Sequence, residues 1–265
     1  MAKTHISTDV RQILVWWLSG VRACLGEKLR TVMLHGSVAL DDFCPRWSDV
    51  DVCVLLESPI TPEEGDVVGA LHDELERCFI GGGDGSWESG QAVEGSYIPV
   101  ALATDPSLAM PCYTAGGTTR RWAVEHPISP FDRYILAHFG FPFVGDHVSF
   151  IPPDADDLIE QTDRELEGLR GWNENSSQSA IWMAGMLHWT ARSLVFWRDD
   201  RMLSKSAALR HEIERGSEFA SAFALALDIR RTGSATAADH TQELQRRFTE
   251  VARPAAREIE RHLRE

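Results

Sequence analysis

The sequence predicts an α/β domain, a mixed sheet with flanking helices, over residues 1–152, and an all-α helical bundle over residues 153–265. In the first part, short apolar runs rich in β-branched residues alternate with amphipathic helical patterns, which is typical of an α/β fold. After Pro152-Pro153 the patterns are helical throughout, so we place the domain boundary at this pair. A chain of 265 residues is long enough to form two small domains.

The N-terminal segment predicts one helix followed by two buried strands. Ser7-Thr8-Asp9 offers N-cap residues, and the helix is expected to end near Gly26. Its apolar residues recur at helical spacing and form one buried stripe: Val10, Ile13, Leu14, Trp17, Leu18, Val21, Cys24 and Leu25. The runs 31–34 and 50–56 are short, apolar and β-branched, and therefore predict buried strands.

A second helix and a third strand follow. Thr61 fits the N-cap, Pro62 the first helical position and Glu64 the reciprocal acid of a capping box. The glycine-rich segment 81–86 lacks the spacing of a phosphate-binding P-loop and predicts only a loop. Residues 92–100 then form another strand-like run.

The remainder of the chain predicts short pieces and then helices. Between residues 105 and 129, glycines and prolines indicate loops. Residues 131–139 predict a helix and residues 141–146 an extended segment. In the second domain, three helices are expected to begin at Asp154, at Ser177 or Ser179, and at Ser204. Two more are expected within residues 217–231 and 237–263 and complete a bundle.

Composition argues against several classes of protein. Hydrophobic content of 43% and charged content of 25% are ordinary for a globular protein, and no apolar run is long enough to span a membrane. The five cysteines are odd in number and lack a Cys-x-x-Cys pair, so we expect reduced thiols in a cytoplasmic protein. The net charge of −14 argues against a nucleic-acid partner, and fits either a polycationic small molecule or simple solubility.

The most informative stretch is Leu-His-Gly-Ser, ending at Ser37, with an Asp-x-Asp pair at Asp49 and Asp51. Gly36, which lacks a Cβ, lets the backbone approach a ligand, and Ser37 offers a hydroxyl and an N–H to a phosphate oxygen. Because strand side chains alternate, Asp49 and Asp51 project from one face and suit Mg²⁺ with bound phosphates. Either dipeptide alone indicates only a turn or solvated acids, but together and in this order they predict a nucleotide and metal site.

Two further residues are candidates for this site. Glu94 lies on the third strand, in the same α/β layer as the two aspartates, and could complete a three-carboxylate site; an exposed strand acid is the alternative. Arg46 lies in the connection that precedes Asp49. Contact with a nucleotide phosphate and neutralisation of acidic neighbours are both open for Arg46.

The stretch from His35-Gly36-Ser37 to Asp49-Val50-Asp51 resembles the signature of the polymerase-β-like nucleotidyltransferase superfamily. The chain length and the order of the two domains further resemble the aminoglycoside adenylyltransferases that modify streptomycin or spectinomycin. This resemblance implies that the Gly-Ser pair contacts the triphosphate of ATP and that the two aspartates hold Mg²⁺. It also implies that Glu94, within Val-Glu-Gly-Ser, is the catalytic base and a third acid at the metal.

The resemblance extends to the second domain. Arg192 in Ala-Arg-Ser-Leu and Lys205 in Ser-Lys-Ser-Ala match family patterns that contact ATP as this domain closes over it. On the acceptor side, Trp122 and Trp172 are compatible with aromatic substrate contacts of the family. Glu174 is the one acid in a region where the family carries several acids that bind the drug, and this departure puts the identity of the acceptor in question.

Together these features predict a cytoplasmic, monomeric, Mg²⁺-dependent enzyme of antibiotic resistance. It would move AMP from ATP to a hydroxyl of a cationic aminoglycoside or aminocyclitol and release pyrophosphate, without nucleic-acid or membrane partners. Two alternatives stay open. The same chemistry could serve another small molecule or a protein acceptor, or the chain could be a non-catalytic, nucleotide-binding regulator.

Overall fold

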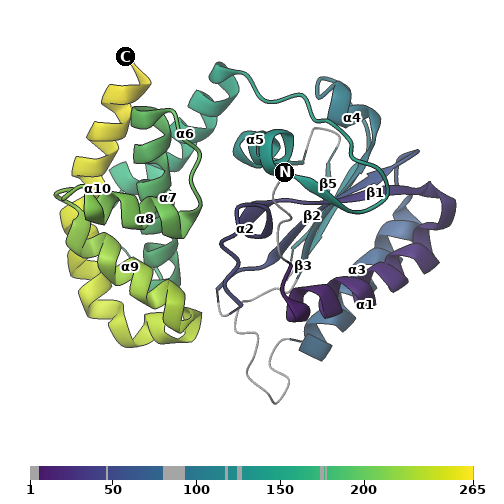
Figure 1. Cartoon of the computed structure of the whole chain (residues 1–265), viewed down its shortest axis with the longest axis horizontal. Coiled ribbons are helices and arrows are strands. Elements are labelled where there is room, and N and C mark those ends of the chain that lie inside the picture. The colour runs from purple at the N-terminus through teal and green to yellow at the C-terminus, as the bar shows by residue number, and fades with distance from the viewer. Residues whose placement is uncertain are drawn as a thin grey trace. The chain divides into compact units, whose positions relative to one another are not determined.

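The computed structural model describes residues 6–45, 47–79, 93–116, 119–123, 127–173, 176 and 178–264, with the backbone alone at residues 79, 119, 234 and 235. The chain divides into two compact units, Met1–Asp154 and Ala155–Glu265. Within the described residues, the first unit combines a sheet with helices and the second is helical (Figure 1). The two predicted fold classes are therefore confirmed, while the role assigned to each unit stays a prediction.

The first unit is built on a six-stranded sheet in the order β5-β4-β3-β2-β1-β6. Its strands have these bounds: β1 (Leu29–Leu34), β2 (Val50–Leu56), β3 (Val93–Pro99), β4 (Cys112–Gly116), β5 (Thr119–Ala123) and β6 (Phe141–Val144). Strands β2 and β3 run parallel, and the other neighbouring pairs are antiparallel. The sheet is mixed, as predicted.

Helices cover the two faces of this sheet. They have these bounds: α1 (Thr8–Leu25), η1 (Gly26–Lys28), α2 (Gly36–Ala39), α3 (Pro62–Phe79), α4 (Ala101–Thr104) and α5 (Pro130–Phe139). Helices α1 and α3 lie side by side on one face and share a core with Val52 and Val54 (Figure 1). The other face, which carries Cys53 and Leu55, packs against residues of α4 and α5. Alternate residues of β2 therefore serve two separate cores.

The predicted helix starts are stabilised by the predicted caps. The Ser7 hydroxyl accepts a hydrogen bond from the Val10 amide at 3.3 Å. At α3 the Thr61 amide donates to Glu64 Oε2 at 2.8 Å, and the Glu64 amide donates to Thr61 Oγ1 at 3.3 Å. This reciprocal pair is a capping box, which satisfies amides that the first helical turn leaves unpaired.

Strands β4 and β5 correct the prediction of loops between residues 105 and 129. Every residue of β4 is buried, so its sequence shows no alternation of apolar and polar residues. Strand β5 lies at the edge of the sheet and reads Thr-Arg-Arg-Trp-Ala, which lacks the apolar run expected of a strand. Pairing with β3 and with each other, not local propensity, specifies these strands.

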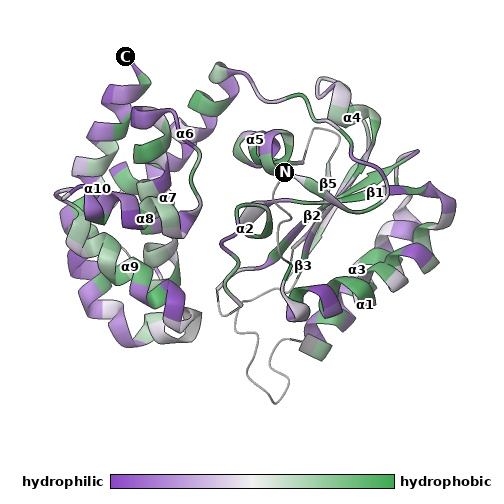
Figure 2. Ribbon diagram, in the orientation of Figure 1, coloured by the Kyte–Doolittle hydropathy of each residue, from purple (hydrophilic) through white to green (hydrophobic). Residues whose placement is uncertain are grey.

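The second unit is a set of packed helices, as predicted. They have these bounds: α6 (Ala155–Arg170), α7 (Ala180–Asp199), α8 (Lys205–Glu214), α9 (Ala220–Thr232), η2 (Ser234–His240) and α10 (Thr241–Leu263). Helix α7 packs against α8, α9 and α10 and is buried along most of its length. Ser179 is its N-cap and accepts from the Trp182 amide at 3.1 Å. Helix α10 mixes hydrophilic and hydrophobic residues along its length (Figure 2), with its apolar residues buried.

None of the helices in the described part of the chain combines the length and the apolar character needed to cross a membrane. The five cysteines all lie in described segments, and no two of them form a disulfide.

Candidate active site

Three carboxylates meet at the ends of the two parallel strands. Asp51 on β2 and Glu94 on β3 are direct register partners, and Asp49 lies two residues before Asp51, so that all three project from one face. One ligand oxygen from each lies within 4.8 Å of those of the other two, and each residue is partly buried. Carboxylates this close repel one another unless a cation lies between them.

The Gly-Ser turn after β1 packs directly against these acids. The His35 amide donates to the carbonyl of Asp51 at 3.2 Å, and the Ser37 hydroxyl lies 3.5 Å from the carbonyl of Asp49. Gly36 has a φ of +54°, and a Cβ at this position would come within 1.8 Å of Asp51 Oδ2. The turn therefore requires glycine both for its conformation and for the space that the carboxylate occupies.

This donor set fits a hard divalent cation. Three carboxylates with oxygens within 4.8 Å of one another supply the ligand type that Mg²⁺ takes, and they leave positions for phosphate oxygens or water. No sulfur or imidazole ligand belongs to the group, as would be expected at a zinc site. The residues are thus chemically suited to Mg²⁺.

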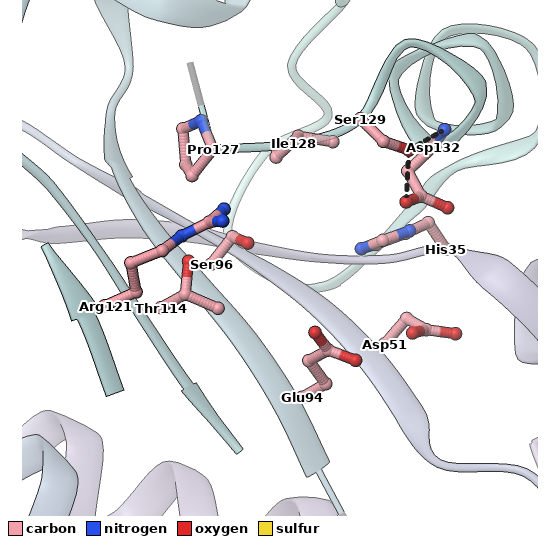
Figure 3. A pocket seen from close by; sticks show the side chains of 10 residues that line it. All are labelled: His35, Asp51, Glu94, Ser96, Thr114, Arg121, Pro127, Ile128, Ser129 and Asp132. Atoms are coloured by element: carbon pink, nitrogen blue, oxygen red, sulfur yellow. Dashed lines mark hydrogen bonds between the residues drawn. The ribbon is translucent and has the colours of Figure 1, made fainter. Parts of the chain in front are cut away.

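A cavity of about 280 Å³ lies beside two of these acids. Its sheet side is formed by Asp51, Glu94, Ser96, Thr114 and Arg121. The facing side comes from the loop before α5 and the first turn of that helix. His35 lies between Asp132 of this helix and Asp51 of the sheet (Figure 3). The cavity belongs entirely to the first unit.

His35 and Asp132 form one wall of this cavity. Burial lowers the pKa of His35, although the nearby carboxylates of Asp132 and Asp49 oppose the shift. Nδ1 of His35 has no hydrogen-bond partner among the described residues. Ser129 holds Asp132 in place by donating its hydroxyl to Oδ2 at 2.6 Å, and it accepts from the Asp132 amide at 3.2 Å (Figure 3).

In the second unit, Arg192 and Lys205 share surroundings with a third cation. Burial lowers the pKa of His188 well below its usual value, and Arg230, Lys205 and Arg192 lower it further. Arg230 is only 2% exposed, and its Nε donates to Ser206 Oγ at 3.0 Å. All three cations are therefore close enough to the buried imidazole of His188 to oppose its protonation.

Four other predicted residues remain, of which the structure describes two. Arg46 and Glu174 fall outside the described residues. Trp122 is paired with Tyr113 on β4, with ring centroids 4.8 Å apart, and it therefore lies on the face of the sheet opposite the carboxylates. Trp172 is buried, its Nε1 donates to Thr249 Oγ1 at 3.0 Å, and its ring stacks on Trp182. Trp122 therefore does not line the cavity, and Trp172 belongs to the core of the second unit.

Sequence reasoning gave no role to several residues that line the cavity or surround His188, among them Arg121, Asp132 and Arg230. The signal for Arg121 was strand alternation beside Trp122, which puts one of the two on each face. Asp132 lies three residues after Ser129, and this spacing indicates an acid of a helix N-terminal cap. Arg230 lies within a helix, and no local sequence pattern distinguishes it from a solvated arginine. Only the packing of the helices reveals that it is buried near His188.

No protein-family model matches this sequence, and no curated protein does. Among solved structures, the chain is similar to the crystal structure of spectinomycin adenyltransferase AAD(9) from Enterococcus faecialis with ATP and spectinomycin. The TM-score is 0.64 at 13% sequence identity, over 90% of this chain and 98% of that chain. The likeness shows a shared fold, in which a mixed sheet with helices precedes a helical region, and it confirms the predicted resemblance at that level.

Proposed function

We propose that this protein is a Mg²⁺-dependent nucleotidyltransferase that moves AMP from ATP to a hydroxyl of a small molecule and releases pyrophosphate. The observation that carries the proposal is the meeting of Asp49, Asp51 and Glu94, with ligand oxygens within 4.8 Å of one another. The Gly36 turn, which packs on Asp51, supports it. An aminoglycoside or aminocyclitol is the first acceptor class to test, because the similar structure holds spectinomycin and ATP.

Asp49, Asp51 and Glu94 would hold Mg²⁺ through their carboxylate oxygens. When bound, the ion supplies positive charge that stabilises the charge developing on the transferred phosphate and on departing pyrophosphate. Two of these carboxylates, Asp51 and Glu94, line the cavity, so an ion held by the group would lie on the sheet face that borders it. Gly36 and Ser37 would contact the triphosphate beside it through backbone N–H groups and the serine hydroxyl.

Glu94 would act as the general base. As the acceptor oxygen attacks the α-phosphorus, its proton passes to the Glu94 carboxylate. A bond forms between that oxygen and the α-phosphorus, and the bond from this phosphorus to the oxygen bridging to the β-phosphorus breaks. The electron pair leaves with pyrophosphate, so atoms and charges balance without another reactant.

Arg192 and Lys205 of the helical unit would contact the triphosphate. Their shared surroundings around His188 support this assignment, because a group of cations stabilises a polyanion more than one isolated side chain does. In this proposal the helical unit closes the site over ATP and the acceptor.

Two alternatives have distinct signatures. An enzyme acting on another acceptor would bind Mg·ATP yet ignore every aminoglycoside and aminocyclitol. A regulator would bind Mg·ATP without consuming it. Glu94 argues for catalysis, because nucleotide binding through Mg²⁺ needs no base aligned beside the two aspartates.

The test is pyrophosphate release from ATP or GTP with Mg²⁺ against a panel of aminoglycosides and aminocyclitols, run beside direct nucleotide binding. We expect release with at least one acceptor. Nucleotide binding without release across the panel would reject the antibiotic acceptor and keep the nucleotide site. Absence of Mg²⁺-dependent nucleotide binding would reject the proposal itself.

A further inference from the structure

A row of polar side chains leads away from Glu94 across the sheet. Ser96 lies two residues after Glu94 on β3, Thr114 is its register partner on β4, and Arg121 is the partner of Thr114 on β5. All four point to the same face and line the cavity (Figure 3). Because neighbouring strands lie about 4.8 Å apart, the row extends roughly 10 Å from β3 to Arg121.

The middle of this row contains a buried hydroxyl without a hydrogen-bond partner in the described part of the chain. Thr114 is 6% exposed, and its Oγ1 has no hydrogen-bond partner among the described residues. Nδ1 of His35, on the facing wall, is also buried and also lacks a hydrogen-bond partner among the described residues. Buried polar atoms are normally paired, so two such atoms on one cavity indicate a hydroxylated ligand or ordered water between them.

Beyond Glu94 and Asp51, the cavity carries one further cation, Arg121, and one further carboxylate, Asp132. Arg121 reaches toward Pro127 on one side, and Asp132 lies beside His35 on the other (Figure 3). Within the described segments no carboxylate lies at ion-pair distance from Arg121, although Arg120, next to it in sequence, pairs with Asp73 on the opposite face. The guanidinium therefore remains available to an oxygen of a ligand.

The order of the strands assigns this cavity to the acceptor. The Gly36 turn follows β1, the metal-binding aspartates belong to β2, and the base is on β3. If the triphosphate lies over the β1 side, the attacking hydroxyl approaches from the other side of Glu94, which is the side of β4 and β5. This step rests on the proposed function.

We propose that the acceptor is bipolar: an amine contacts Asp132, and a carboxylate or carbonyl oxygen contacts Arg121, with hydroxyls between them. Charge-assisted hydrogen bonds at both ends fix its orientation and leave one hydroxyl at Glu94. A guanidinium at the far end disfavours polyamines, because a second ammonium group would be placed against it. Within the acceptor class to be tested first, oxygen-rich compounds with few amines would be preferred over polyamines.

The experiment compares three sugar-derived probes that share hydroxyls and differ in charge: glucosaminate, with an amine and a carboxylate, glucosamine, with the amine alone, and gluconate, with the carboxylate alone. Ligand-observed NMR titration gives their dissociation constants for the wild-type chain. The variants are Arg121→Glu and Asp132→Asn, with Arg120→Gln as the matched control, and thermal melting verifies folding. Mg²⁺-dependent ATP binding is measured in parallel, with Asp51→Asn as its negative control.

We expect glucosaminate to bind most tightly to the wild type. Arg121→Glu should weaken gluconate and glucosaminate binding about tenfold and leave glucosamine equal or stronger, whereas Asp132→Asn should weaken glucosamine and glucosaminate and leave gluconate unchanged. Such a reversal between probes cannot come from misfolding. Preference for glucosamine over glucosaminate, no binding by any probe, or an Arg121→Glu effect equal for all probes would overturn the inference.

The parallel nucleotide measurement separates the two proposals. Mg²⁺-dependent ATP binding without the expected order of probes overturns the bipolar acceptor and leaves the nucleotide site in place. The expected order of probes without ATP binding supports the bipolar cavity and overturns the proposed nucleotidyl transfer.

Discussion

Asp51 on β2 and Glu94 on β3 lie side by side as register partners of the one parallel strand pair in the described sheet. This relationship needs the whole first unit, because 42 residues of chain, including α3, separate the two acids and return β3 alongside β2. It also explains the glycine at position 36, whose missing Cβ leaves room for the Asp51 carboxylate.

The metal assignment predicts that Asp51→Asn abolishes the stabilisation of the protein by Mg·ATP. In the wild type, ligand at one hundred times its dissociation constant should add about 2.7 kcal/mol to the free energy of unfolding. Thermal melting with and without Mg·ATP measures it. Asp41→Asn is the matched control, because Asp41 has a φ of +51°, which asparagine also tolerates. An equal shift in the Asp51→Asn protein would contradict the assignment.

The turn predicts that Gly36→Ala is destabilising and eliminates Mg·ATP binding. A side chain at φ +54° costs about 1 kcal/mol or more, and the added Cβ would displace Asp51. Gly185→Ala is the control. Gly185 lies within α7, nothing comes within 4 Å of a Cβ there, and alanine should raise the free energy of unfolding by about 0.5–1 kcal/mol. Urea unfolding compares the two, and a Gly36→Ala protein with wild-type stability and binding would count against the account.

The sequence was sufficient for the parts of this site that are local. Asp-x-Asp at the start of a strand and a Gly-Ser turn after another can be recognised from spacing alone, and so can the capping box of Thr61 and Glu64. The sequence was insufficient where the pairing of distant strands determines which side chains reach the site. Arg121 reaches the cavity only because β5 pairs with β4, and Trp122 then faces away. Trp172 is compatible with a substrate contact by its position in the sequence, and packing against Trp182 and Phe248 places it in the core of the second unit.

The buried hydrogen bonds of His72 predict loss of stability in acid. Its Nε2 accepts from Trp17 Nε1 at 3.3 Å and contacts the Tyr97 hydroxyl at 2.8 Å, while Nδ1 contacts the carbonyl of Val93, next to Glu94. Burial lowers the pKa of His72 from 6.5 to about 3, so only the unfolded chain takes up the proton between these values.

Stability is therefore complete above pH 6.5 and is lost as the pH falls toward 3, by about 1.4 kcal/mol per pH unit for His72 alone. Urea unfolding between pH 7 and pH 5 measures the slope, to which the buried His35 and His188 add. His72→Gln should reduce the slope, and His138→Gln, at an exposed position, should not. An unchanged slope in the His72→Gln protein would refute this explanation.

The cations of the helical unit predict a preference for the longer phosphate chain. Lys205→Gln and Arg192→Gln should each weaken ATP binding about tenfold and AMP binding much less, because charge-assisted contacts to the outer phosphates would be lost. Isothermal titration with both nucleotides gives the ratio. Arg231→Gln, at an exposed position on α9, is the control. Equal losses for ATP and AMP would place these side chains away from the outer phosphates.

The central claim is that Glu94 removes the proton of an acceptor hydroxyl during AMP transfer. The most direct measurement is the rate of acceptor-dependent pyrophosphate release at saturating Mg·ATP, for the wild type, for Glu94→Gln and for Glu74→Gln, an exposed acid on α3. We predict that Glu94→Gln still binds ATP but reacts roughly 10²–10⁴-fold more slowly, and that Glu74→Gln matches the wild type. A Glu94→Gln protein that releases pyrophosphate at the wild-type rate would contradict the account.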